Sequence, residues 1–301
     1  MQIKEKENKD GFFHLPVMAD QVINSIKTLE KEMLKGGLII DATVGGGGHA
    51  YMMLKKFPNI FLIGIDQDPE ARSAASKKLN DFGNRVQITN GNFCEFVPPR
   101  KAIAVLADLG VSSHQLDTND RGFSFRKPGP LDMRMNPCKK LTAADLIEEL
   151  SENELANIIY EYGEERLSRR IARKIKNDLK ESGQYKDTQS LAYSIAGCFP
   201  KKIRYSRIHP ATKTFQALRI AVNNELNVLD KFLQESPKWI DKNGLIFIIS
   251  FHSLEDRKVK QSFKVNTILE NMTKKPITAS SLEIDQNKRS RSAKLRIAKR
   301  I

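Results

Sequence analysis

The segment LIIDATVGGGGHA (Leu38–Ala50) decides the fold. Its apolar start, Leu38–Ala42, is typical of a strand, the four glycines Gly45–Gly48 predict a turn, and a helix is expected to begin at His49. A strand, a glycine-rich turn and a helix in this order form the place where a parallel α/β sheet approaches a nucleotide-type cofactor. The segment also contains the dinucleotide pattern G-x-G-x-x-A, so taken alone it leaves an NAD-dependent oxidoreductase open.

Short apolar runs alternate with segments of helical periodicity on both sides of this segment. Buried parallel strands appear in a sequence as nearly continuous apolar runs, so we expect an α/β fold whose sheet is covered on both faces. The expected strands are residues 38–42, 60–66, 85–89, 103–108 and 244–250, and the expected helices include 22–33, 49–57, 69–79 and 211–233.

The alternation stops between Gln115 and Thr212, where a Gly- and Pro-rich loop is followed by helical periodicity. A structureless loop of this length is uncommon inside a domain. We therefore predict that residues 115–212 form an all-helical domain, inserted into a sheet domain made of residues 11–114 and 213–301. Residues 1–10 are polar and charged, and we expect them to be a disordered lead-in.

Three of the expected strands end in an acid, namely Asp41, Asp66 and Asp108. In an open parallel sheet the ligand lies beyond the carboxyl ends of the strands. Asp66 is suited to hold ribose hydroxyls, but Asp41 and Asp108 would repel the pyrophosphate of NAD. S-adenosylmethionine has an ammonium and a sulfonium and no phosphate, so the acids favour that cofactor. The alternative for each aspartate is a cap on the following turn, and His49 is either a cap, a surface histidine or a cofactor contact.

Lys and Arg number 50 and Asp and Glu 36, which gives a net charge of +14 and indicates a polyanionic partner. The bases gather between Thr188 and Asn224 and in the last 16 residues. An apolar run long enough to span a membrane is absent, as is the apolar segment of a secretory signal, so we expect a cytoplasmic protein. The three cysteines are widely separated, which predicts reduced thiols and no metal site.

Seven segments together resemble the bacterial 16S ribosomal RNA cytosine-N4 methyltransferase family. The matches follow one another in order over nearly the whole chain and several are long. They are HLPVM (His14–Met18), DATVGGGGHA (Asp41–Ala50), DLGVSSHQLD (Asp108–Asp117), RGFSFRKPGPLDMRM (Arg121–Met135), HPATKTFQALRIAVNNEL (His209–Leu226), ISFHSLEDRKVK (Ile249–Lys260) and RSRSAKLR (Arg289–Arg296).

The resemblance implies a class I, Rossmann-like methyltransferase sheet with an inserted all-helical domain. It implies methyl transfer from S-adenosylmethionine to the N4 amine of a specific cytidine in the decoding region of 16S ribosomal RNA. By motif position, the cofactor contacts would be Gly47, Gly48, His49, Asp66, Phe93, Asp108 and Gln115. Phe93 would lie against the adenine. His114 stands where the family commonly has proline, which would loosen the turn that leads to Gln115.

Two further readings stay open. A cytosine-C5 methyltransferase needs a cysteine nucleophile, and Pro137-Cys138 resembles such a motif. A ribosome assembly factor with a vestigial methyltransferase fold would bind RNA without catalysis, but it would have lost the glycine loop and the three acids.

For the methyl transfer itself, we expect Asp108 to polarise the cytosine amine. His252, Glu255 and Asp256 either border the cytosine site or cap the helix that begins at Ser253. We expect contacts to ribosomal RNA phosphates from a set of basic side chains, and we expect removal of residues 286–301 to leave cofactor binding intact. The set is Lys201, Lys202, Arg204, Arg207, Arg289, Arg291 and Arg296.

Overall fold

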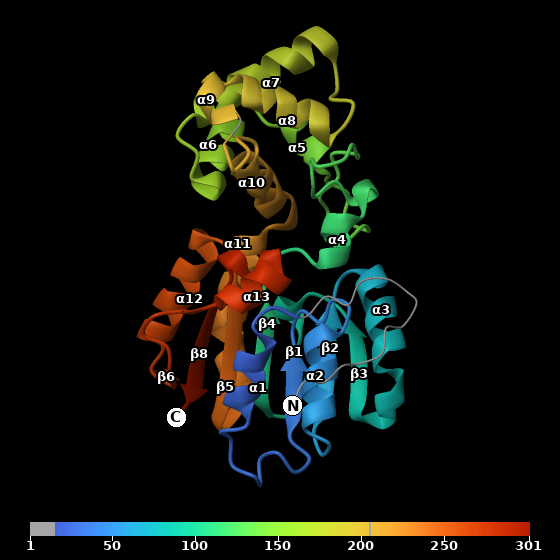
Figure 1. Cartoon of the computed structure of the whole chain (residues 1–301), viewed down its shortest axis with the longest axis vertical. Coiled ribbons are helices and arrows are strands. Elements are labelled where there is room, and N and C mark those ends of the chain that lie inside the picture. The colour runs from blue at the N-terminus through green and yellow to red at the C-terminus, as the bar shows by residue number, and fades with distance from the viewer. Residues whose placement is uncertain (1–15, 205) are drawn as a thin grey trace.

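A computed structural model describes residues 16–204 and 206–301 (Figure 1). The lead-in predicted at residues 1–10 and the start of the first motif, His14 and Leu15, lie outside the described residues. The described part contains one sheet, with the strand order β3-β2-β1-β4-β5-β8-β6 and with β7 paired to β8. The strands are β1 (Leu38–Asp41), β2 (Phe61–Asp66), β3 (Val86–Asn90), β4 (Ala102–Asp108), β5 (Ile240–Ser250), β6 (Leu269–Asn271), β7 (Ile277–Thr278) and β8 (Lys294–Arg300).

The first five strands are parallel, and β8 is antiparallel to β5 and to β6. This confirms the expected α/β fold, and the order is the one typical of class I methyltransferases. The five expected strands are all present, with ends that differ from the prediction by at most one residue, except that β5 begins four residues earlier. Successive side chains of a strand point to opposite faces, and in β1 Ile39 packs on one face while Leu38 and Ile40 pack on the other.

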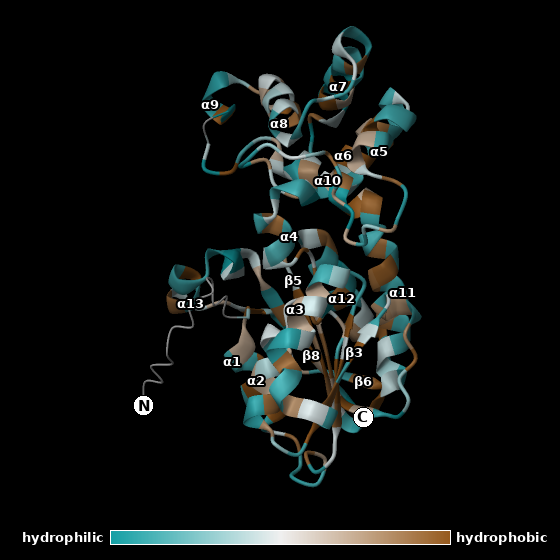
Figure 2. Cartoon of the chain, turned by 90° about the vertical axis from the view of Figure 1, so that its right-hand side faces the viewer, coloured by the Kyte–Doolittle hydropathy of each residue, from teal (hydrophilic) through white to brown (hydrophobic). Residues whose placement is uncertain are grey.

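Helices cover both faces of the sheet, as Figures 1 and 2 show. One face is covered by α1 (Ala19–Ile26), α2 (Gly48–Lys56) and α3 (Pro69–Leu79), and the other by α11 (Glu225–Trp239) and α12 (Ser253–Val265). Between them lie strands that are mostly apolar (Figure 2). The N-terminal helix is shorter than predicted, because turns follow Ile26 and bring Leu29 and Met33 onto the core without a helix.

A second group of helices lies beyond the carboxyl ends of the strands, above the sheet in Figure 1. Its core is separate from the two cores of the sheet and is built from the apolar faces of α5, α6, α7, α8 and α10. The chain enters this group through α4 (Ser113–Asp117), and its helices are α5 (Ala143–Glu149), α6 (Glu152–Gly163), α7 (Ser168–Ser182), α8 (Thr188–Gly197), α9 (Lys201–Arg204) and α10 (Thr212–Asn223).

The predicted helix 211–233 is two helices, because Asn224 adopts a left-handed conformation with φ 55° and ends α10 before α11 begins. Phe215, Leu218 and Val222 of α10 pack into the core of the helical group, whereas Leu229 and Phe232 of α11 pack on the sheet. The predicted division at residues 212 and 213 stays a prediction, and we propose that the helical domain instead extends to Asn224.

The basic C-terminal segment is part of the sheet. Strand β8 lies between β5 and β6, and its Leu295 and Ile297 are buried. The expectation that residues 286–301 form a removable tail is therefore wrong, because their removal takes a strand out of the sheet. The remaining short elements are η1 (Asn80–Arg85), η2 (Phe93–Glu95), η3 (Asn119–Arg121), α13 (Ser281–Gln286) and η4 (Lys288–Ser292).

Candidate functional site

Three aspartates meet at the carboxyl edge of the sheet, because β1, β2 and β4 are neighbouring parallel strands that end there. The carboxylate of Asp66 accepts hydrogen bonds from the backbone N–H of Gly45, at 2.9 Å, and of Asp68, at 2.9 Å. The backbone N–H of Asp108 donates to Thr43 Oγ1 at 2.7 Å. Hydrogen bonds thus tie the turn after β1 to the ends of both neighbouring strands.

The glycines of this turn give α2 its close contact with α3. Gly47 precedes α2 with φ 78°, in the left-handed region, and a Cβ there would lie 3.3 Å from the Ala75 backbone. At Gly48 a Cβ would lie 3.0 Å from the Pro16 ring. A side chain at either position would push the turn outward, so the glycines hold the backbone in the conformation that a cofactor loop requires.

Two buried carboxylate oxygens in this group make no hydrogen bond within the described residues, Asp41 Oδ2 and Asp108 Oδ1. Burial raises the pKa of Asp41 to about 7, although the Thr43 N–H lowers it. Burial also raises the pKa of Asp108 well above its ordinary value, and the negative charges of Asp41 and Glu255 raise it further. An unpaired buried carboxylate is costly, so this edge of the sheet favours a cationic ligand and disfavours a phosphate. These carboxylate oxygens fit the positively charged groups of S-adenosylmethionine.

His49 is buried in α2 and is neither a surface residue nor a helix cap. Its Nε2 lies 2.9 Å from the Val17 carbonyl oxygen, and its Nδ1 lies 3.8 Å from Asp108 Oδ2. Burial lowers its pKa to about 4, while the bond to Val17 opposes this shift. The imidazole is therefore neutral, bound to the segment before α1 and lying beside the strand-end Asp108.

Phe93 and Gln115 lie on elements that follow β3 and β4. Phe93 is partly buried in η2, and its ring centroid lies 5.0 Å from that of Phe232 in an edge-to-face arrangement. Gln115 closes a capping box with Ser112, so α4 is well formed even though His114 replaces the family's proline. The Gln115 amide donates to Asp68 Oδ2 at 2.8 Å. Contacts of either residue with a cofactor remain predictions.

Asp68 and Arg121 are buried residues of the site region that the sequence prediction missed. Arg121 Nη1 lies 2.7 Å from Asp68 Oδ2, and Nη2 donates to the carbonyl oxygens of Arg134 and Met135. The position of Asp68 directly before Pro69 is a signal for a helix cap, and its side chain does cap α3. Its ion pair with a residue 53 positions away carries no local signal.

His252 and Glu255 do cap the helix that follows β5. The side chain of His252 accepts from the Glu255 N–H, and the Glu255 carboxylate accepts from the N–H of Phe251 at 2.9 Å. Asp256 lies one residue further and pairs with Arg296 at 2.7 Å. The expectation that Arg296 contacts phosphates is therefore wrong, since its side chain is only 3% exposed and already paired.

The other predicted phosphate contacts divide into two groups. Lys201, Lys202, Arg207 and Arg291 are exposed. Arg204 donates to the carbonyl oxygens of Phe199 and Gly197, and Arg289 pairs with Asp117 at 2.6 Å. Within residues 16–204 and 206–301, no helix is both long and apolar enough to cross a membrane.

The chain is similar to known methylases over nearly its whole length. A model of the MraW methylase family matches residues 11–301. Ribosomal RNA small subunit methyltransferase H from Prochlorococcus marinus strain NATL1A is 61% identical over 291 residues, covering 97% of this chain and 96% of the relative. The protein of the same name from strain MIT 9211 is 56% identical over 301 residues, covering 99% of each. The chain therefore belongs to the MraW methylase family.

Proposed function

We propose that this protein transfers a methyl group from S-adenosylmethionine to the N4 amine of a cytidine in the decoding region of 16S ribosomal RNA, in the cytoplasm. The observation that carries the proposal is the pair of unpartnered buried oxygens, Asp41 Oδ2 and Asp108 Oδ1, beside the glycine turn. A methylase needs a cationic methyl donor, and these oxygens are the anionic partners that such a donor requires.

S-adenosylmethionine, when bound, supplies a methyl group on a positively charged sulfur. Asp41 and Asp108 would hold its cationic groups, and Asp66 its ribose hydroxyls, as the strand-end positions indicate. Gly47 and Gly48 would let the backbone approach, and Phe93 would lie against the adenine. His49 and Gln115 support this arrangement through Asp108 and Asp68.

The amine of cytosine is a weak nucleophile, because its lone pair is delocalised into the ring. Catalysis therefore rests on holding the amine in line with the methyl group and on removing water from the site. The helical domain lies over the carboxyl edge of the sheet (Figure 1), so an RNA strand bound to it would present a base to that edge. The target base would leave its stack to enter.

The test is to incubate the protein with labelled S-adenosylmethionine and small ribosomal subunits that lack the modification, and to identify the labelled nucleoside by mass spectrometry. We expect N4-methylcytidine. Label in 5-methylcytidine would favour the C5 chemistry and would point to Cys138, which is exposed. Cys138→Ser separates the two chemistries, because it would abolish C5 methylation and leave N4 methylation unchanged.

Calorimetry separates an enzyme from an assembly factor with a vestigial fold. We expect binding of S-adenosylmethionine to the wild type, and binding weaker by about 10- to 100-fold for Asp108→Asn, as expected when one charged partner is lost. Absence of any binding by the wild type would contradict the enzymatic proposal.

A further inference from the structure

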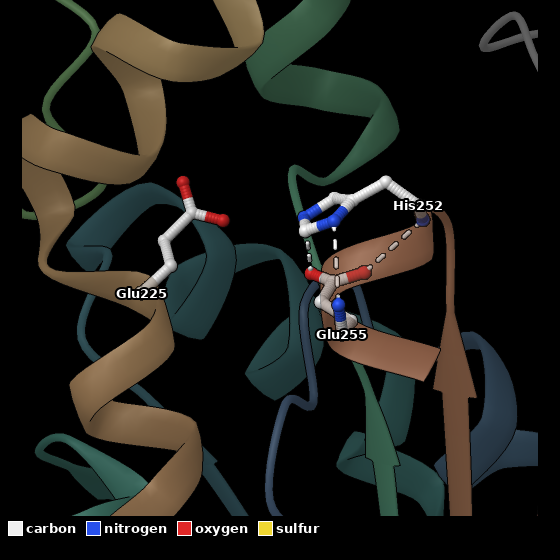
Figure 3. A group of neighbouring side chains, drawn as sticks. All are labelled: Glu225, His252 and Glu255. Atoms are coloured by element: carbon white, nitrogen blue, oxygen red, sulfur yellow. Dashed lines mark hydrogen bonds and ion pairs between the residues drawn. The ribbon is translucent and has the colours of Figure 1, made fainter. Parts of the chain in front are cut away.

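Glu225, His252 and Glu255 form a buried charged group beyond the carboxyl edge of the sheet (Figure 3). His252 and Glu255 cap α12, and Arg219 donates to both oxygens of Glu225, at 2.8 Å and 2.9 Å. Contacts inside the protein account for this group, so a ligand is not needed to explain it. A group of exposed side chains on α8 has no such explanation.

Tyr193 is the most exposed aromatic side chain in the described part of the chain, at 84%. It lies in the middle of α8, whose exposed positions are Gln189, Tyr193 and Gly197. Residues four apart share one face of a helix, so these three form a single stripe about 12 Å long, which we name the α8 face. A Cβ at Gly197 would meet no atom within 4 Å, so the space one turn beyond the tyrosine is open.

Basic side chains flank the start of the α8 face. Gln189 Nε2 donates to the carbonyl oxygen of Arg126 at 3.1 Å, and Thr188 Oγ1 donates to that of Lys127 at 3.2 Å. These bonds fix the loop before α5 against the first turn of α8. The side chains of Arg126 and Lys127 are both exposed. Two cationic groups therefore lie at this end of the stripe.

Basic side chains also flank the other end of the α8 face. Arg204 donates to the carbonyl oxygens of Gly197, at 3.1 Å, and of Phe199, at 2.8 Å. These bonds hold α9 beside the end of α8 (Figure 2). Helix α9 also carries Lys201 and Lys202, which are exposed. The tyrosine thus lies between two groups of cations.

The acids that border the α8 face are engaged inside the helical domain. Asp187 is the N-cap of α8. Asp178 of α7 accepts a hydrogen bond from Ser194 and pairs with Lys174 at 2.5 Å. From residue 188 to residue 224 the chain has no acid at all. The α8 face therefore attracts anions.

Tyr160 on α6 is an exposed tyrosine of the same domain with the opposite surroundings. Its side chain is 60% exposed, and Glu161 follows it directly. Residues 145–165 contain eight acids and no Lys or Arg. A polyanion would be repelled there. Of these two exposed tyrosines, Tyr193 is therefore the one whose surroundings suit RNA.

We propose that the Tyr193 ring stacks on an unpaired base of the substrate RNA, while the cationic groups at both ends of the α8 face bind its phosphates. This inference rests on the proposed function and identifies the RNA segment as single-stranded. An aromatic side chain stacks on a base of any sequence, but it needs a base that is splayed out, because the bases of a duplex stack on one another. An enzyme that takes its target base out of the stack acts on RNA of this kind.

A short segment connects the α8 face to the edge of the sheet where the methyl donor would bind. Arg121 pairs with Asp68, which caps α3 at that edge. Arg126 follows Arg121 by five residues, and five residues of chain span at most about 18 Å. An RNA strand that leaves the α8 face at its Arg126 end is therefore close enough to present a base to the carboxyl edge.

The test compares the wild type with Tyr193→Ala, Tyr193→Phe and Tyr160→Ala for binding to protein-free 16S ribosomal RNA that lacks the modification. We expect Tyr193→Ala to bind about 5- to 150-fold more weakly, the usual effect of losing one stacked base. Tyr193→Phe keeps the ring and should bind as the wild type does, and so should Tyr160→Ala, the matched control. The slope of log affinity against log salt should be the same in all four proteins, because no charge is removed.

Two further measurements separate stacking from other roles of Tyr193. A fully paired RNA duplex should bind equally to all four proteins, since its bases are not free to stack on the ring. In methylation of small ribosomal subunits, Tyr193→Ala should raise KM for the RNA substrate and leave kcat unchanged, because the ring lies away from the reacting atoms. Its affinity for S-adenosylmethionine should equal that of the wild type.

If the wild type forms N4-methylcytidine and Tyr193→Ala binds RNA as tightly as the wild type, the inference is overturned and the proposed function stands. An equal loss of affinity for the duplex would overturn it as well. A loss confined to small subunits, including a wild type that binds subunits and not the free RNA, would assign the α8 face to a ribosomal protein and overturn it too. A wild type that methylates no cytidine overturns both.

Discussion

Asp41 is the residue whose ionisation we expect to be coupled to binding of the proposed cofactor. It is almost fully buried, one of its oxygens has no partner within the described residues, and burial raises its pKa to about 7. A cationic ligand interacts with the ionised form, so binding and ionisation favour each other. If the proposed cofactor binds beside Asp41, occupancy of the site should therefore depend on pH.

We predict that the affinity for S-adenosylmethionine rises between about pH 6 and about pH 8, the range in which Asp41, with a pKa of about 7, ionises. Asp41→Asn should bind about 10- to 100-fold more weakly at the higher pH and should show a much smaller rise. Isothermal titration calorimetry at several pH values measures both effects. An equal rise in the wild type and the variant would assign the pH dependence to another group.

The raised pKa of Asp41 has the opposite consequence for the stability of the protein without ligand, which falls as the pH rises. The ordinary pKa of Asp41 is 3.8 and the folded value is about 7, so between these values the native state binds more protons than the unfolded state. Its contribution to the free energy of unfolding therefore falls as pH rises through this window. In urea unfolding without cofactor, Asp41→Asn should lose less stability than the wild type over the same pH range.

Among the elements, those with a strong local pattern are the ones that the sequence predicts. Strands β1 to β4 are apolar runs, and α3 has proline at its first position, so their bounds are found to within two residues. Strand β8 was missed because Lys294, Arg296 and Lys299 give it the composition of a basic tail, although Leu295 and Ile297 alternate with them. The break at Asn224 was missed because nothing in the local pattern requires a left-handed residue there.

The residues of the candidate site are likewise predicted only where a local sequence pattern marks them. The strand-end aspartates and the glycine turn follow from local order along the chain. The ion pair of Asp68 with Arg121 joins residues 53 positions apart and depends on how distant segments pack, which local patterns do not encode. The pair between Asp68 and Arg121 joins the N-cap of α3 to η3, so it is a connection between elements.

We predict that Arg121→Met lowers the free energy of unfolding by about 3–5 kcal/mol, because it leaves the buried charge of Asp68 without its partner. Urea unfolding monitored by circular dichroism measures this change. Arg173→Met is the control, since Arg173 pairs with Glu152 at 3.3 Å on an exposed surface, and it should cost less than about 1 kcal/mol. Equal losses in the two variants would show that burial does not set the strength of the pair.

At the scale of the whole molecule, the net charge of +14 is distributed over both domains, but only some of it is available to a partner. Arg296 is buried and Arg289 is paired, whereas Lys201 and Lys202 on α9 are exposed in the helical domain. Each lysine that contacts a phosphate releases a counterion, and this release makes binding weaken as salt rises. The helical domain is therefore expected to carry much of the electrostatic contact with RNA.

We predict that the double variant Lys201→Gln, Lys202→Gln binds small-subunit RNA more weakly and lowers the slope of log affinity against log salt by about one per lysine. Lys31 and Lys242 are the matched control, because they are exposed at the opposite edge of the sheet, before β1 and at the start of β5. Their replacement by glutamine should leave the slope unchanged. Because neither pair lies in the core, binding of S-adenosylmethionine should be the same in all three proteins. An unchanged slope in the α9 variant would exclude this helix from the RNA contact and would favour contacts through Arg207 and Arg291 instead.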